Sequence, residues 1–142
     1  MAEDSTQVTS RATTRAATIF TALAVIVGAF QLALLVGAPW GFLTWGGRVP
    51  GRLPASMRAA AVVSALLMVG FALLVRARAG LVTPAWQARA RRPAWFVVAY
   101  CAVGVVANAV TPSPWERIVW LPVVSAMLFC SLVVARGESG RS

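Results

Sequence analysis

The fold is decided by an apolar stretch near the N-terminus, AATIFTALAVIVGAFQLALLVG, which covers residues 16–37. Three further apolar stretches follow at residues 59–75, 94–110 and 118–135. A helix needs about 20 mostly apolar residues, and at least about 17, to cross a hydrocarbon core of roughly 30 Å. All four stretches reach this lower limit. The sequence therefore predicts an all-α polytopic membrane protein, a bundle of four transmembrane helices.

Composition supports this prediction independently of the four stretches. Hydrophobic residues make up 59% of the 142 residues, and the mean hydropathy is +0.77. Soluble domains contain about 45–50% apolar residues, even when glycine is counted. We expect one transmembrane domain at residues 16–135, between a flexible cytoplasmic tail at 1–15 and a second cytoplasmic tail at 136–142. The first stretch is longer than the core of a secretory signal peptide, so we expect it to be retained as a helix.

The arginines predict the orientation of the helices. All 13 basic residues are arginine, and nine of them lie in the two tails and the second connection. The remaining four, in the first and third connections, are Arg48, Arg52, Arg58 and Arg117. Short cytoplasmic segments carry an excess of basic residues, so both termini are expected in the cytoplasm. The net charge of +9 indicates contact with membrane lipids, through anionic headgroups on the cytoplasmic side, and not with nucleic acid, because the arginines cluster at the membrane edges.

The first and third connections are then expected on the same, outer, side of the membrane. The first, GAPWGFLTWGGRVPGRLP at residues 37–54, is dense in glycine and proline and contains Trp40 and Trp45. The third, TPSPWER at residues 111–117, offers Ser113 as an N-cap, Pro114 for the first turn of the last helix, and Glu116 near the positive end of the helix dipole. A linker alone does not require these tryptophans.

These connections supply most of the candidate binding residues. Glu116 is expected to lie near one of the outer arginines, where the cluster is either a site for an anionic headgroup or carboxylate, or a salt bridge that ties two loops together. Three polar residues lie in the outer halves of the helices, namely Gln31, Ser64 and Asn108. They are expected either to join helices by hydrogen bonds or to line a pocket. Trp86, Trp95 and Trp120 are interpreted as membrane anchors. The full candidate set is Trp40, Trp45, Arg48, Arg52, Arg58, Trp115, Glu116, Arg117, Gln31 and Asn108.

Several chemistries lack the side chains that they require. The chain has no histidine and only two cysteines, Cys101 and Cys130, which excludes the common zinc sites and Cys-His nucleophile pairs. No metal or cofactor is expected. The four stretches contain no ionisable Asp, Glu, Lys, Arg or His, which argues against a proton-coupled carrier. It also separates the chain from the small multidrug exporters, which rely on a carboxylate in the first helix.

The loop motifs carry a resemblance. The run GAPWG with WGG at residues 37–47, followed by Asn108-Ala109, Ser113 and Glu116-Arg117, resembles a family of small bacterial four-helix integral membrane proteins whose function is uncharacterised. The resemblance covers nearly all of the chain after the tail, although residues 48–51 depart from it. It implies a multi-pass protein of the bacterial cytoplasmic membrane, and it implies no activity.

Three functions follow as hypotheses. The first is a non-enzymatic binding or accessory protein that uses its outer loops, as a homo-oligomer or with a membrane protein partner. The second is a small oligomeric transporter or channel. The third is a membrane enzyme acting on a lipid-linked substrate, for which Glu116 is the only candidate acid or base.

Overall fold

A computed structural model describes residues 2–137, and every regular element in this range is helical. The long helices are α1 (Ala2–Leu35), α2 (Ala55–Arg78), α4 (Arg91–Val110) and α5 (Pro114–Arg136). A short helix, α3 (Pro84–Arg89), lies in the second connection, and two 3₁₀ turns, η1 (Gly41–Leu43) and η2 (Trp45–Gly47), lie in the first. The four long helices are long and apolar enough to cross a membrane, which confirms the prediction of an all-helical protein with four spans.

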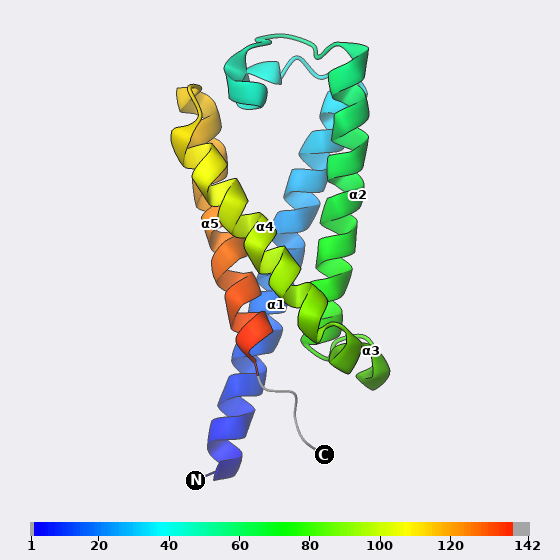
Figure 1. Cartoon of the computed structure of the whole chain (residues 1–142), viewed down its shortest axis with the longest axis vertical. Coiled ribbons are helices and arrows are strands. Elements are labelled where there is room, and N and C mark those ends of the chain that lie inside the picture. The colour runs from blue at the N-terminus through cyan, green and yellow to red at the C-terminus, as the bar shows by residue number, and fades with distance from the viewer. Residues whose placement is uncertain (1, 138–142) are drawn as a thin grey trace.

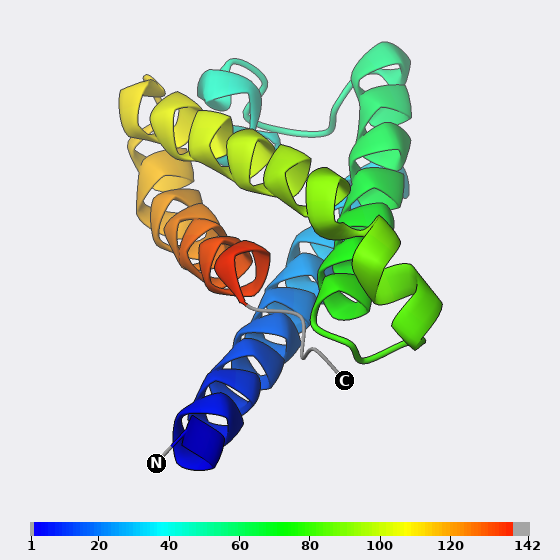
Figure 2. The same cartoon turned by 60° about the horizontal axis from the view of Figure 1, so that its bottom comes forward.

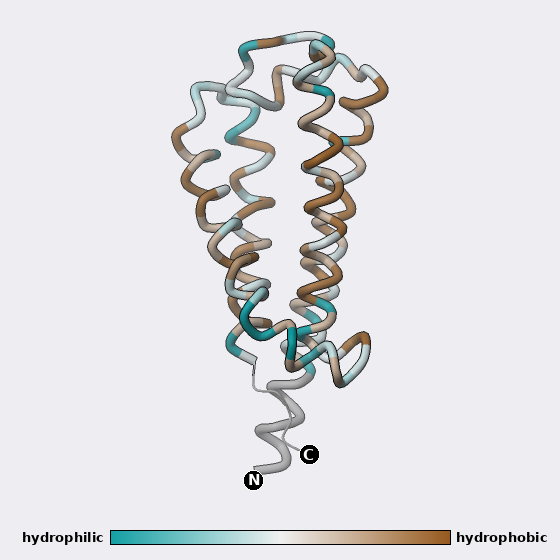
Figure 3. The backbone as a smooth tube through the Cα atoms, turned by 45° about the vertical axis from the view of Figure 1, so that its right-hand side comes forward, coloured by the Kyte–Doolittle hydropathy of each residue, from teal (hydrophilic) through white to brown (hydrophobic). Residues whose placement is uncertain are grey.

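The four long helices form two antiparallel hairpins, α1 with α2 and α4 with α5 (Figure 1). Helix α1 also packs along α5, whereas α2 and α4 meet over a shorter distance. The first and third connections lie together at one end of the molecule, which we call the loop end (Figures 1 and 2). The second connection and the end of α5 lie at the opposite end, which we call the arginine end. Hydrophilic residues gather at both ends, and the spans between them are mainly hydrophobic (Figure 3).

The core lies where the two hairpins meet. Its fully buried side chains include Phe20 of α1, Val75 of α2, Val97 of α4 and Val134 of α5. Only 22–33% of each spanning segment is buried, and the exposed residues of the spans are largely apolar. Such a large apolar surface is suited to contact with lipid tails and not with water.

The helix boundaries differ from the expected ones at several places. Helix α1 begins at Ala2 and not at Ala16, so it includes nearly all of the segment that was expected to be a tail. Residues 2–15 contain neither proline nor glycine, and extending an existing helix is much easier than starting one. Helix α1 ends at Leu35 because Gly37, with φ of 96°, forms a C-terminal turn in which Ala38 N–H donates to the Ala33 carbonyl. In the second tail, residues 138–142 lie outside the described range.

A buried arginine joins the two hairpins at the arginine end. Arg78 is the last residue of α2 and is only 5% exposed. Its Nη2 donates a hydrogen bond to the carbonyl oxygen of Gly137, directly after α5. This bond satisfies a carbonyl that follows the last turn of α5 and has no helical donor.

Candidate functional site: a loop platform

The two connections at the loop end fold together into one structure. We call residues 40–52 and 111–120 the loop platform. Within the first connection, Gly41 N–H donates to the Gly51 carbonyl over 3.0 Å, which closes the loop on itself. Trp45, Gly46 and Gly47 have φ of 55°, 69° and 71°. A tryptophan rarely adopts a positive φ, so the contacts around it must hold this turn in place.

Glu116 joins the third connection to the first. Its Oε2 accepts a hydrogen bond from the backbone N–H of Gly46, 70 positions away in sequence, over 2.8 Å. The same oxygen accepts a hydrogen bond from Thr111 Oγ1, also over 2.8 Å. Hydrogen bonds to an ionised group are stronger than neutral ones. The carboxylate therefore fixes the η2 turn against the start of α5.

Ser113 and Trp120 extend the same connection on either side of Glu116. Ser113 Oγ accepts from Glu116 N–H over 3.2 Å, which confirms its expected role as the N-cap of α5, and it donates to the Phe42 carbonyl over 3.0 Å. Trp120 Nε1–H donates to the Leu43 carbonyl over 2.7 Å. Three side chains of one short segment thus bind three successive parts of the first connection.

Sequence reasoning missed the part that Trp120 takes in the platform. Trp120 was interpreted as a membrane anchor, but its ring packs edge-on against Phe30 at a centroid distance of 4.6 Å. Phe30 in turn lies parallel to Trp40 at 6.2 Å. One feature of the sequence could have indicated this role. Trp120 follows Glu116 by four residues, and residues four apart share a helix face.

The predicted pairing of Glu116 with an arginine is wrong. In the part of the chain that the structure describes, no arginine forms an ion pair with this carboxylate. Arg58 Nε donates instead to the Leu35 carbonyl at the end of α1 over 2.7 Å, and Arg117 Nη2 donates to the Thr111 carbonyl after α4 over 2.6 Å. Carbonyls at helix C-termini lack helical donors and attract cations, so they compete well for these two side chains. Arg48 and Arg52 are exposed and have no hydrogen bond to another described residue.

The amides within the helices do not join the platform. Asn108 Nδ2 donates to the Gly104 carbonyl over 2.8 Å, one turn earlier in its own helix. This bond connects no second helix. The side chains of Gln31 and Ser64 are partly buried and form no hydrogen bond within residues 11–137.

The platform also carries exposed aromatic and cationic side chains. Trp40, Trp45 and Trp115 are 43%, 49% and 62% exposed. Arg48 and Arg52 are exposed on the same connection as the first two. The carboxylate, the hydroxyls and one indole N–H serve internal hydrogen bonds. Over the described range, no three His, Cys, Asp or Glu residues come together as a metal site would require.

Comparison with known proteins adds no family to these observations. The chain matches no protein-family model, no curated protein and no solved structure. The resemblance that the loop motifs suggest therefore stays a prediction.

Proposed function

We propose that the protein is a non-enzymatic binding or accessory protein of the membrane, which uses the loop platform on its outer face to hold a partner with anionic groups. The observation that carries this proposal is that the platform contains two groups of side chains, one bonded internally and one exposed. Its acid and hydroxyl groups bond internally, whereas its aromatic rings and two arginines stay exposed. Tryptophan and arginine are the residues most enriched at binding hot spots.

The internal bonds suit a preformed binding surface. A loop that is ordered before binding loses less conformational entropy when a partner arrives. Hydrogen bonds of Glu116, Ser113 and Trp120 with the first connection order the platform. Each of these bonds joins residues that are 70 or more positions apart in sequence. The exposed arginines would give such a surface its preference for negative charge.

The enzyme hypothesis is less well supported by the same geometry. A general acid or base needs access to the proton that it transfers. The Oε2 atom of Glu116 already accepts hydrogen bonds from Gly46 and Thr111. The transporter hypothesis gains no support from the amides, since Asn108 bonds within its own helix.

Photocrosslinking in intact membranes tests the proposal. A benzophenone amino acid at Trp45 should give a discrete adduct, and one at Trp86, which is similarly exposed in α3 at the arginine end, should not give the same adduct. Combining the Trp45 probe with Arg48→Gln and Arg52→Gln should remove most of the adduct. Absence of any adduct at Trp45 and at Trp115, or an adduct that both arginine changes leave intact, would overturn the proposal.

A further inference from the structure

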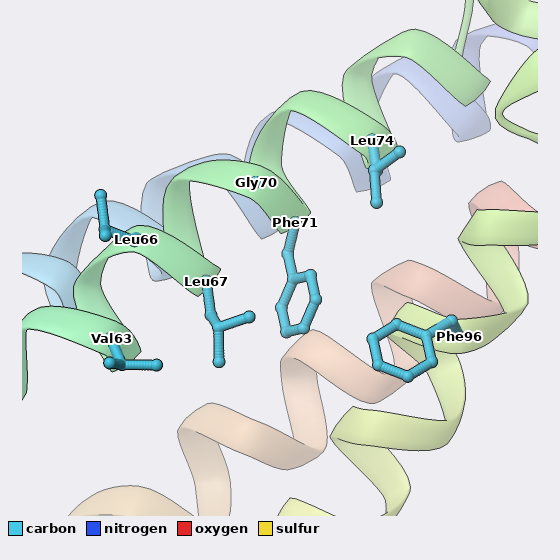
Figure 4. A pocket seen from close by; sticks show the side chains of 7 residues that line it. All are labelled: Val63, Leu66, Leu67, Gly70, Phe71, Leu74 and Phe96. Atoms are coloured by element: carbon cyan, nitrogen blue, oxygen red, sulfur yellow. The ribbon is translucent and has the colours of Figure 1, made fainter. Parts of the chain in front are cut away.

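An apolar groove runs between α2 and α4 on the surface of the spans (Figure 4). It has a volume of about 370 Å³. Six of its lining residues belong to α2, and Phe96 of α4 faces them across the groove. The α2 residues are Val63, Leu66, Leu67, Gly70, Phe71 and Leu74. A Cβ atom added at Gly70 would meet no other atom within 4 Å, so the groove is open at this position.

The length and direction of the groove match one leaflet of a bilayer. Val63 and Leu74 are 11 residues apart, which corresponds to about 16 Å along a helix at 1.5 Å per residue. A hydrocarbon core of roughly 30 Å gives each leaflet about half that depth. Leu74 and Phe96 lie at the side of the groove nearest the arginine end, since α2 ends at Arg78 and α4 begins at Arg91. The groove therefore extends inward from the arginine end.

Positive charge lies one helical turn beyond the groove on both walls. Arg78 follows Leu74 by four residues, and Arg92 precedes Phe96 by four, so each shares a helix face with a lining residue. Helix α3 contacts both α2 and α4, which places the end of α2 and the start of α4 near each other. Arg91 and Arg92 are exposed. Glu116 is the only acid in residues 11–137, and it lies at the opposite, loop end of the molecule.

We infer that this groove binds an acyl chain of an anionic phospholipid from the leaflet at the arginine end, with the lipid phosphate held by Arg91 and Arg92. Burial in the groove contributes little binding free energy for the acyl chain, because the lipid tails around it are as apolar as the groove. Selectivity therefore comes from charge. A basic residue near the membrane surface favours an anionic lipid about fivefold, and two arginines favour it about 25-fold. This inference depends on the membrane spans and not on the proposed function of the loop platform.

Native mass spectrometry of the full-length protein tests the charge requirement. The detergent-purified protein is incubated with equal amounts of phosphatidylglycerol and phosphatidylcholine that carry identical acyl chains. We expect one retained lipid, with phosphatidylglycerol favoured about 25-fold. The double variant Arg91→Gln/Arg92→Gln should lower this preference to about onefold, while Arg11→Gln/Arg15→Gln, the same charge change on exposed residues of α1 outside the groove, should preserve it. Equal loss in both double variants, or no preference in the unaltered protein, would overturn the inference.

A second comparison tests the groove itself. Gly70→Trp places a large side chain in the groove, and Val103→Trp places the same side chain on an exposed part of α4 outside it. Retention of phosphatidylglycerol should fall about as far in Gly70→Trp as in Arg91→Gln/Arg92→Gln, because an acyl chain excluded from the groove no longer brings its phosphate to these arginines, and it should stay unchanged in Val103→Trp. Gly70→Leu gives the same comparison with a smaller side chain if the tryptophan variant does not fold. Unchanged retention in a folded Gly70 variant, or a dimer crosslinked through Gly70→Cys in membranes, would show that no lipid chain occupies the groove.

Discussion

Replacing Glu116 with alanine should release the η2 turn from the start of α5. The substitution removes the acceptor for two hydrogen bonds, each 2.8 Å long and partly buried. Hydrogen bonds to a charged group contribute about 1.5–3 kcal/mol each. Only the bond from Gly46 joins the first connection to α5, and at the lower value, since water can replace part of the loss at this partly exposed site, its removal favours opening by about 1.5 kcal/mol. That energy corresponds to an increase of about 10-fold in the population of the open loop.

Hydrogen–deuterium exchange of the purified protein measures this opening directly. The amides of residues 41–47 should exchange about 10-fold faster in Glu116→Ala, while amides in the core of α1 and α5 keep their protection. Glu116→Gln should fall between the two, because a neutral amide oxygen still accepts a weaker bond. Arg48→Gln is the matched control and should leave exchange in this loop unchanged. Unaltered exchange in Glu116→Ala, or equally fast exchange in Arg48→Gln, would refute the reasoning.

Three further predictions follow from the platform and the spans. Gly41→Ala should lower the thermal unfolding midpoint by several degrees, because the new Cβ would lie 2.7 Å from the Gly51 carbonyl oxygen, whereas Gly51→Ala, where a Cβ meets no atom within 4 Å, should have little effect. Trp120→Phe keeps an aromatic ring but loses the hydrogen bond to Leu43, so unfolding in denaturant should show a loss of about 1 kcal/mol; a loss below about 0.3 kcal/mol would contradict the role of the indole N–H. Reporter enzymes fused at Gly51 and at Thr83 should report the outer side and the cytoplasm respectively, and the reverse pattern would contradict the predicted orientation.

The sequence was sufficient to predict the features that depend on local properties. Apolar length predicted four spans, and the residue types Ser113 and Pro114 predicted the start of the last helix. The start of α1 was missed because a polar helix without a hydrophobic face leaves no periodic signal. Its residues 2–15 are compatible with a helix and do not require one.

The partners of Glu116 could not be read from the sequence for a different reason. Charge alone favoured an arginine, and four arginines were available on the same side. The actual donor is the backbone N–H of Gly46, and every residue except proline has such a group. Its exposure depends on the positive φ values of the turn, which are a product of the folded loop. The sequence therefore cannot indicate which backbone group a side chain will bind, because the residue type on the backbone side of the bond is not specific.

The bond between Glu116 and Gly46 also has a consequence for the order of events during synthesis. Its two residues are 70 positions apart, and chains grow at about 5–20 residues per second, so Glu116 is made about 4–14 s after Gly46. During that interval the first hairpin has its loop without the carboxylate, Ser113 and Trp120 that later order it. The conformation of the first connection is therefore completed only when the second hairpin has been made, and a chain that stops before residue 116 has a first connection without the hydrogen bonds that order it.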